Sequence, residues 1–164
     1  MVTPCEAEEV FRRLVAILSR GNVPFVVHQH EPTRTIEEAE RNLSFAVERI
    51  VKTVAFRARG GGIILAALRG TRRVDYPRLA ALIGVTRRDI SSLSPMEVKE
   101  TIGVEPGSVS PLMPVDSAIL IIDRDVLSIA PTLYCGSGRP DRTLEMAPED
   151  LARLTGARIA CFSK

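Results

Sequence analysis

The chain has 164 residues, 45% of them hydrophobic, and its 22 Lys and Arg against 20 Asp and Glu leave a net charge of +2. These values predict a single folded domain over residues 1–164 with a buried core, and they exclude a disordered tail. The near-balance of charge argues against bulk wrapping of DNA or other nucleic acid, although eight arginines between residues 57 and 88 leave room for a local basic patch.

Cysteine usage and hydropathy indicate the compartment. Cys5, Cys135 and Cys161 are odd in number and too scattered for a CxxC metal or redox unit, so free thiols in a reducing, cytoplasmic setting are expected. No leader-like segment and no apolar run of membrane-spanning length occur, so no membrane contact is expected. Seven aromatic residues and no Trp supply few platforms for stacking bases.

Hydrophobic periodicity, capping residues and glycine or proline turns divide the chain into helices and strands. In chain order the expected elements are a helix over residues 6–19, a strand over 24–30, a helix over 35–43, strands over 50–58 and 63–68, a helix over 75–82, a strand over 89–93, a helix over 94–103, strands over 117–122, 128–135 and 143–146, a helix over 148–154 and a strand over 157–162.

The turns predict how some of these strands pair. A glycine turn joins the two most apolar strands, 50–58 and 63–68, which are expected to be buried. An Asp-Arg-Asp turn is expected to pair strands 117–122 and 128–135, with Pro131 at an edge or a bulge. Hairpins with interspersed helices predict an α+β fold around a mixed, curved sheet with flanking helices.

Lys52 is the anomaly in its apolar strand. Alternation puts it on the face shared by Val54 and Phe56, which is expected to be the inner face. A buried ammonium group is costly unless it is paired or its pKa falls. Two interpretations stay open here: a group that faces a ligand, or a lysine near the strand end whose ammonium reaches water.

Two glycine-rich loops are the other unusual stretches. Residues 103–112 contain two glycines, two prolines and two serines between apolar runs, a composition that holds one irregular backbone path. On these residues alone an ordinary turn-rich loop is the simpler interpretation, and a ligand-binding loop is the alternative. The second loop, residues 136–142, follows one strand and leads to another, so it is interpreted as a turn that can line a site.

His28 and His30 lie two residues apart and so share one face of their strand, as a metal-binding pair would. No third ligand lies nearby in the sequence, so the more economical interpretation is a pair of satisfied or exposed strand histidines. No metal site and no cofactor are predicted.

The usual catalytic motifs are missing, since the sequence contains no GxSxG, Walker loop, HExxH or GxGxxG opening a helix. What remains is an inward-facing lysine, two rigid loops with hydroxyls, and apolar walls. This set suits the binding of a small anionic or carbonyl-bearing ligand. It would also suit hydrolysis of an already labile ester, where backbone N–H donors and one cation suffice.

Five segments together resemble a known family: Lys52-Thr53 in its apolar strand, residues 75–84, the loop 103–112, residues 121–123, and the stretch from Gly136 through Glu145 and on to residue 154. Their order and content are similar to YbaK-type proteins, the free-standing relatives of the editing domain of bacterial prolyl-tRNA synthetase. The likeness runs from about residue 23 to residue 161. It implies the fold of that synthetase-associated domain, whose curved sheet is pseudo-barrel-like.

The resemblance further implies an aminoacyl-tRNA deacylase that clears mischarged tRNA in trans, without a cofactor. The strand lysine, here Lys52, lies in the family's substrate pocket and is needed for activity, and the glycine of the Pro-Gly loop, here Gly107, makes backbone contacts at the scissile ester. The nucleophile is assisted by the substrate itself, through the terminal ribose hydroxyl or the amino-acid side chain. One departure is Thr143, which stands where some relatives carry an aspartate.

Substrate and partners follow from the same resemblance. The favoured substrate is a small amino acid such as Ala or Cys on tRNA for proline, with Ser or Thr esters as alternatives. The expected partners are the mischarged tRNA 3′ end and prolyl-tRNA synthetase. Gly107 and Ser108 are hypothesised to offer N–H groups to the ester carbonyl, and Ser110 either binds the terminal nucleotide or ties up its loop. The full set of expected substrate-binding residues is Thr53, Ser108, Val109, Ser110, Pro111, Gly136, Ser137 and Gly138. The rival hypothesis is a non-catalytic module that binds a nucleotide or a tRNA end.

Overall fold

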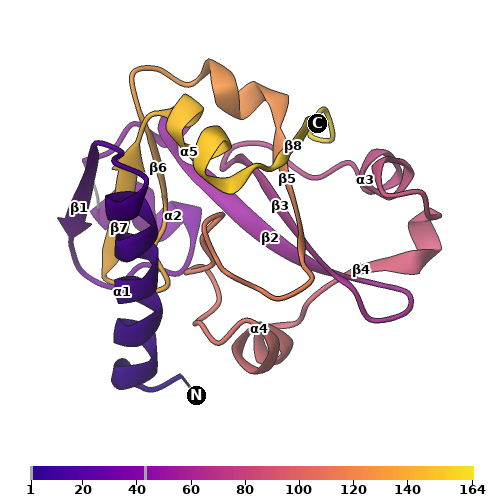
Figure 1. Ribbon diagram of the computed structural model, residues 1–164, viewed down its shortest axis with the longest axis horizontal. Helices are drawn as coiled ribbons and strands as arrows, with labels where there is room; N and C mark the ends of the chain where they lie inside the picture. Colours follow the sequence, from indigo (N-terminus) through magenta and orange to yellow (C-terminus); the bar gives the residue numbers. More distant parts are fainter. Residues whose placement is uncertain (1, 43) are drawn as a thin grey trace.

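The computed structural model describes residues 2–42 and 44–164 (Figure 1). The helices are α1 (Pro4–Arg20), α2 (Ile36–Asn42), α3 (Tyr76–Leu82), α4 (Pro95–Thr101) and α5 (Pro148–Thr155), with short 3-10 turns η1 (Val47–Arg49), η2 (Arg87–Asp89) and η3 (Arg124–Ser128). The strands are β1 (Phe25–Gln29), β2 (Val51–Ala58), β3 (Ile63–Arg69), β4 (Ile90–Ser92), β5 (Ile119–Asp123), β6 (Leu133–Gly136), β7 (Arg142–Met146) and β8 (Arg158–Ala160). Leu43, where the second helix was expected to end, lies outside the described residues.

The helices begin where capping chemistry places them. At the start of α1 the Thr3 hydroxyl accepts a hydrogen bond from the Glu6 N–H, and the Glu6 carboxylate accepts one from the Thr3 N–H at 2.7 Å. Ser94 and Glu97 repeat this reciprocal arrangement at α4. Each pair satisfies backbone N–H groups that lack partners within the helix, which fixes the first turn.

The strands form two sheets. One is mixed, in the order β4-β2-β3-β5-β8, with β3, β5 and β8 parallel to one another; the other is antiparallel, in the order β1-β7-β6. The prediction of an α+β fold around a mixed sheet is confirmed. In Figure 1 the long β2 and β3 cross the molecule between α1 and the three-stranded sheet on one side and α3 with β4 on the other.

One predicted pairing is wrong. The segments 117–122 and 128–135 do not form a hairpin: β5 pairs with β3 and β8, whereas β6 pairs with β7 in the other sheet. The Asp-Arg-Asp stretch begins the 3-10 turn η3, and Pro131 follows in a loop with a cis peptide bond before β6. The Asp123 carboxylate explains the change of direction, because it accepts hydrogen bonds from the N–H groups of Phe162 and Ser163 at 2.8 Å and so holds the C-terminal segment beside β5.

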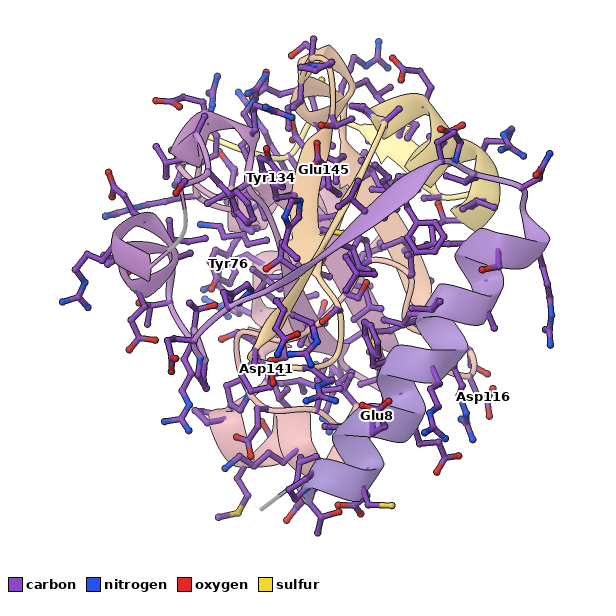
Figure 2. All side chains as sticks on the ribbon, turned by 90° about the vertical axis from the view of Figure 1, so that its left-hand side faces the viewer. Glu8, Tyr76, Asp116, Tyr134, Asp141 and Glu145 are labelled. Carbon is purple, nitrogen blue, oxygen red and sulfur yellow. The ribbon has the colours of Figure 1, made fainter. Side chains whose placement is uncertain are left out.

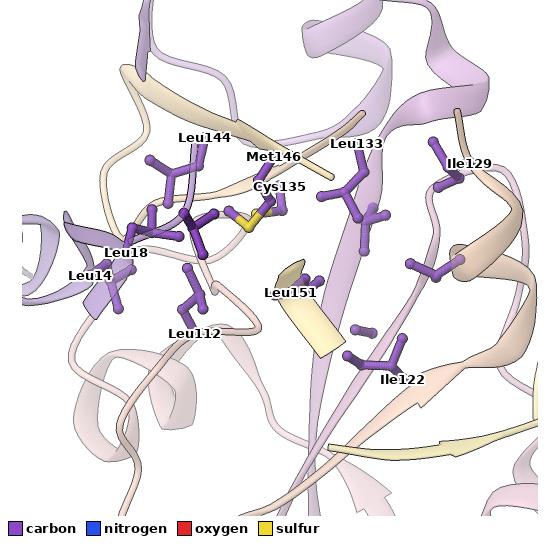
Figure 3. Packing of buried hydrophobic residues seen from close by; sticks show 14 residues of the cluster. Leu14, Leu18, Leu112, Ile122, Ile129, Leu133, Cys135, Leu144, Met146 and Leu151 are labelled. Atoms are coloured by element: carbon purple, nitrogen blue, oxygen red, sulfur yellow. The ribbon is translucent and has the colours of Figure 1, made fainter. Parts of the chain in front are cut away.

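A shared hydrophobic core joins the two sheets (Figure 3). Leu14 and Leu18 of α1 pack with Leu144 of β7, and the same cluster includes Val51 of β2 and Ile122 of β5. Full burial of one leucine side chain stabilises a fold by roughly 1.5–3 kcal/mol. The core therefore fixes β2 against β6, and an isolated bridge between Ile50 and Tyr134 marks the point where the sheets meet.

Within residues 2–42 and 44–164, no helix combines the length and the hydropathy that crossing a bilayer requires.

Candidate functional site

A cavity of about 280 Å³ opens where the first residues of β2 face β6. Its remaining walls come from residues 33–39, from the loop before β5 and from the β6–β7 hairpin. Figure 2 turns the β1 side of the molecule toward the viewer and labels Tyr134 and Glu145, which pair across that hairpin, and Asp141 near its turn. Segments more than a hundred residues apart thus enclose one space.

Lys52 borders this cavity. Its side chain is half-buried, and its ammonium donates a hydrogen bond to the Gly70 carbonyl oxygen at 3.2 Å. Burial lowers the pKa of Lys52, the positive charge of Arg73 lowers it further, and Glu37 opposes the shift. Among the described residues no carboxylate lies within ion-pair distance of the ammonium. Lys52 is therefore a partly desolvated cation that an anionic ligand would stabilise.

Gly107 reaches the same cavity from the opposite loop. Its φ is +88°, a conformation that favours glycine, and a Cβ at this position would lie 2.2 Å from the carbonyl oxygen of Arg34. Gly136 is equally constrained, since a Cβ there would lie 2.4 Å from the Val109 carbonyl oxygen. Backbone therefore packs against backbone at both positions, with Gly107 against Arg34 and Gly136 against Val109, and only glycine permits this approach.

Half of the predicted site residues lie in the cavity wall. These are Lys52, Thr53, Gly107, Val109 and Gly136. The Thr53 hydroxyl oxygen is fully buried and has no hydrogen-bond partner among the described residues. Such an orphaned polar atom is rare in native structures and indicates a missing partner, such as a ligand or water.

The other half support the loops from behind. The five residues that are absent from the cavity wall are Ser108, Ser110, Pro111, Ser137 and Gly138. The Ser108 N–H donates to the Glu105 carbonyl at 3.0 Å, so it is not free to donate to an ester, contrary to the hypothesis. The Ser110 hydroxyl accepts a bond from the Leu112 N–H within its own loop. The Gly138 N–H donates to the Ser108 carbonyl at 2.9 Å and ties the two loops together.

Two aromatic rings in the wall were not predicted. Phe45 and Tyr134 stack with their centroids 4.0 Å apart, and the Arg49 guanidinium lies 4.7 Å above the Tyr134 ring. No periodic pattern links residues 45 and 134, and the low aromatic content hid them. This pair gives that part of the cavity wall an aromatic, apolar lining.

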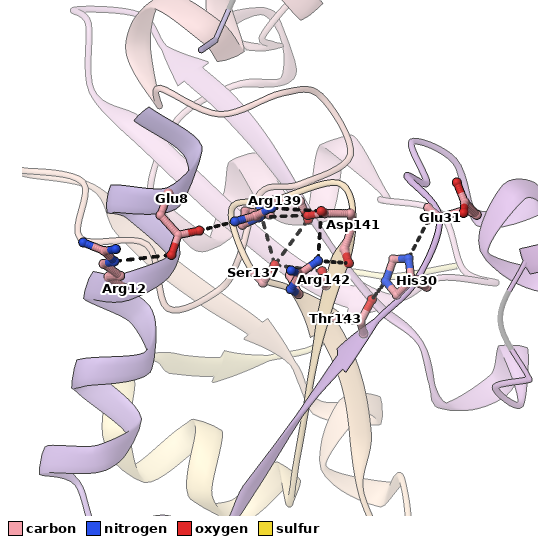
Figure 4. Close-up of polar contacts among 9 residues, drawn as sticks. All are labelled: Glu8, Arg12, His30, Glu31, Ser137, Arg139, Asp141, Arg142 and Thr143. Atoms are coloured by element: carbon pink, nitrogen blue, oxygen red, sulfur yellow. Dashed lines mark hydrogen bonds and ion pairs between the residues drawn. The ribbon is translucent and has the colours of Figure 1, made fainter. Parts of the chain in front are cut away.

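Three arginines in the wall were also not predicted as site residues, because no local sequence pattern shows that they meet at one cavity. Arg139 pairs with Asp141 at 2.8 and 2.9 Å and with Glu8 of α1, and Arg142 pairs with Asp141 at 2.9 Å (Figure 4). The hydrogen bond from Arg139 holds the pKa of Asp141 below its usual value. Arg34, the third arginine, has no ion pair among the described residues. Arg139 and Arg142 are therefore held and balanced by carboxylates, whereas Arg34 and Lys52 are wall cations without an ion pair among the described residues.

The two strand histidines are engaged with protein groups. His28 Nε2 lies 2.7 Å from the Glu145 carboxylate, and His30 Nε2 lies 2.7 Å from the Thr143 hydroxyl. In the part of the chain that the structure describes, no three His, Cys, Asp or Glu residues are grouped as a metal site would need. The two rings thus belong to separate hydrogen-bonded pairs.

Glu145 anchors a polar network behind the aromatic pair, and replacing it by Gln should reveal its charge. Its pKa is lowered, chiefly by the Thr132 hydroxyl and also by His28 and Arg49. A carboxyl whose pKa is lower in the folded protein than in the unfolded chain stabilises the fold at any pH above the unfolded-chain pKa. This stabilisation is lost as the pH falls through the pKa of the folded protein. Glu145→Gln should therefore lower the free energy of unfolding by roughly 1 kcal/mol at pH 7. Urea unfolding of both proteins at pH 7 and pH 3 should show the difference shrinking in acid; a constant difference would contradict the prediction.

Cys135 also lines the cavity, and it should be the unreactive thiol. Burial raises its pKa to about 12, whereas Cys5 and Cys161 are exposed. Because the thiolate is the reactive form, an aromatic disulfide reagent at pH 8 should titrate two thiols in the native protein and the third after denaturation. Rapid reaction of all three in the native state would contradict this assignment.

Comparison with known proteins connects this cavity to a family. The family model described as "Aminoacyl-tRNA editing domain" matches residues 30–154. The uncharacterized protein YwhH of Bacillus subtilis is 26% identical over 125 residues, which are 76% of this chain and 77% of that protein. The multifunctional Ser/Thr-tRNA deacylase ProXp-y of Escherichia coli K12 is 24% identical over 156 residues, 93% of this chain and 92% of the relative. A proline–tRNA ligase of Xanthomonas campestris is 30% identical over 97 residues, which are 59% of this chain and 17% of the ligase.

Two solved structures share the fold over nearly their whole length. The crystal structure of the hypothetical protein APE2540 has a TM-score of 0.83 and 28% identity, with 93% of this chain and 99% of that chain covered. A crystal structure described as a candidate trans-editing enzyme for prolyl tRNA synthetase has a TM-score of 0.78 and 26% identity, with 100% and 99% covered. The matched region contains the cavity wall from residue 33 to residue 143. The chain belongs to the aminoacyl-tRNA editing domain family, as the resemblance of its motifs to YbaK-type proteins predicted.

Proposed function

We propose that this protein edits in trans: it hydrolyses the ester of mischarged tRNA, most favourably a small amino acid such as Ala or Cys on tRNA for proline. Membership of the editing family makes the chain an aminoacyl-tRNA deacylase. The observation that carries the proposal is the cavity whose wall contains both Lys52 and Gly107. Its setting is the cytoplasm, with the mischarged tRNA 3′ end as substrate and prolyl-tRNA synthetase as the enzyme whose errors it clears.

Lys52 holds the phosphate or ribose of the tRNA 3′ end. A lysine ammonium acts as a point charge, which suits an anion presented at the mouth of a cavity. Burial and the positive charge of Arg73 both disfavour the charged form of Lys52 and so lower its pKa. A bound anion favours the charged form and offsets both effects. Binding the nucleic acid at Lys52 therefore gains more than it would at an exposed lysine.

Gly107 stabilises the reacting carbonyl. Two observations support this role: among the described residues its N–H donates to no protein acceptor, and Gly107 lies in the cavity wall. During hydrolysis a water oxygen bonds to the ester carbon, negative charge collects on the carbonyl oxygen, and the bond to the ribose oxygen then breaks. Loss of one such donor costs on the order of 10²–10³ in rate.

The substrate supplies the proton acceptor for that water. No Asp or Glu lines the cavity in the described part of the chain, and its charged wall residues are cations. A terminal ribose hydroxyl next to the ester orients the water and relays its proton: it accepts the proton of the water while passing its own to the leaving ribose oxygen. The volume of about 280 Å³ falls just below the range of pockets for drug-sized ligands, which favours a small aminoacyl group beside the terminal ribose.

A deacylation panel tests the proposal. tRNA for proline charged with Ala, Cys, Ser or Thr is incubated with the wild type and with Lys52→Ala, and correctly charged prolyl-tRNA serves as the reference. The wild type should release at least one small amino acid faster than proline, and Lys52→Ala should not. Tight tRNA binding without release of any amino acid would replace the proposal by the non-catalytic binding module.

A further inference from the structure

Thr143 and His30 form a hydrogen-bonded pair at the cavity wall that the roles above leave unused. Thr143 lies on β7 and lines the cavity. Its hydroxyl oxygen lies 2.7 Å from His30 Nε2 (Figure 4). His30 follows β1, and its own N–H donates to the Asp141 carbonyl at 3.1 Å, which ties it to the same hairpin. The pair is thus held from both sides of the strand pairing.

The backbone selects which nitrogen of His30 carries the proton. His30 Nδ1 lies 2.7 Å from the Glu31 carbonyl oxygen, which can only accept a hydrogen bond. Nδ1 therefore carries the proton, and in the neutral ring Nε2 is left as an acceptor. The Thr143 hydroxyl must then donate its only hydrogen to Nε2, so the lone pairs of its oxygen are what it presents to the cavity.

The Thr143 acceptor lies in a wall whose charged side chains are hydrogen-bond donors. The charged residues of the cavity wall are Arg34, Lys52, Arg139 and Arg142, all cations, and no carboxylate lines the cavity in the described part of the chain. An aminoacyl ester brings an α-ammonium group into this space, where the nearby carboxylates of Asp141 and Glu8 are already paired with the wall arginines. That group needs an oxygen acceptor, because an unpaired charge in a partly enclosed site is costly.

We propose that Thr143 accepts a hydrogen bond from the α-ammonium of the aminoacyl group, and that His30 is the positioning residue that keeps the Thr143 hydroxyl turned as an acceptor. This inference rests on the proposed deacylase function and adds to it the chemical group by which the substrate is recognised. Without His30 the hydroxyl rotates freely, and for part of the time its hydrogen points at the ammonium in place of a lone pair. Without Thr143 the ammonium loses the one wall hydroxyl that a histidine holds as an acceptor among the described residues.

The test compares an aminoacyl-tRNA with its α-hydroxyacyl analogue, which replaces the ammonium by a neutral hydroxyl of similar size. The amino acid used in both esters is the one that the wild type releases fastest in the deacylation panel. Each variant's ratio of kcat/KM for the two esters is divided by the wild-type ratio, so the greater intrinsic lability of the ammonium ester cancels. Thr143→Val should lower this ratio by about 10- to 100-fold, as expected for a hydrogen bond to a charged group, and Thr143→Ser should restore most of it.

Matched controls separate recognition from folding. His30→Ala should lower the ratio several-fold, whereas His28→Gln, which changes the other histidine of the same strand face, should leave it unchanged. Thr53→Val tests the rival acceptor, because the Thr53 hydroxyl also belongs to the cavity wall and has no partner among the described residues; its ratio should fall far less than that of Thr143→Val. Thermal unfolding of each variant confirms that it folds.

Three outcomes would overturn the inference. If wild type hydrolyses the esters but Thr143→Val keeps the wild-type ratio, Thr143 is not the acceptor; if Thr53→Val lowers the ratio instead, the acceptor is Thr53. A ¹⁵N-histidine NMR spectrum of the full chain that shows the neutral His30 ring protonated on Nε2 would overturn the positioning role without any assay of activity. A wild type inactive on the whole panel would instead remove the proposed function, on which this inference depends.

Discussion

Replacing Lys52 by Ala should lower kcat/KM for deacylation by about 100- to 1000-fold, the loss expected when one preorganised charge or donor is removed from a reacting centre. Lys52→Met, which keeps the length of the side chain, should lose as much. Both follow from the position of the ammonium in the cavity wall without a carboxylate partner among the described residues. Single-turnover rates with a mischarged tRNA, measured with enzyme in excess over tRNA but below saturation, give kcat/KM.

The fold should survive these changes. Because the pKa of Lys52 is lowered, the folded protein binds this proton less tightly than the unfolded chain, so the charge is a small burden on stability below the lowered pKa and not a support. Lys52→Met should therefore melt no lower than the wild type at pH 7. Lys99→Ala is the matched control. Lys99 does not line the cavity, and its ammonium lies 3.4 Å from the Glu105 carboxylate, so deacylation activity should not change. Equal activity of Lys52→Ala and Lys99→Ala would defeat the deacylase mechanism.

Gly107→Ala should reduce deacylation by at least about 100-fold and destabilise the protein by roughly 2–4 kcal/mol. Two costs combine in this change. An alanine at a φ of +88° is strained, and its Cβ would lie 2.2 Å from the Arg34 carbonyl oxygen, so either the loop or residues 33–39 must move and the cavity loses its shape. Urea unfolding measures the first effect and single-turnover deacylation the second.

Gly103→Ala isolates the two costs. Gly103 lies in the same loop with a φ of +83°, but a Cβ there would meet nothing within 4 Å. It should lose only about 1–2 kcal/mol from the backbone conformation and should keep its activity. If Gly103→Ala and Gly107→Ala behaved alike, the close approach to Arg34 would have no functional importance, and the loop would act only as a turn.

Several features of the site were readable from the sequence because they are local. The alternation of β2 places Lys52 on the side of Phe56, which is fully buried, and the Pro-Gly loop around Gly107 follows from residues whose backbone preferences are intrinsic. The capping pair of Ser94 and Glu97 also needed only near neighbours in sequence. The family resemblance rested on these same local motifs.

The hairpin prediction for 117–122 and 128–135 failed because a strand's sequence gives its faces but not its partner. Either neighbour would bury β5 equally well; its place between β3 and β8 depends on Asp123, whose carboxylate binds backbone N–H groups about forty residues later in the chain. The same limit hid Phe45 and Tyr134. No local pattern could show that these two rings stack.

The sequence by itself determined the mixed α+β architecture, the family, and the lysine and glycine on which the proposed chemistry depends. Only the tertiary structure decided what surrounds them: which serines face away from the cavity, which arginines line it, and that a threonine–histidine pair presents an acceptor there. The physical reason is range. Backbone preference and side-chain alternation act over a few residues, whereas a cavity is enclosed by segments that meet only when the hydrophobic core brings two sheets together.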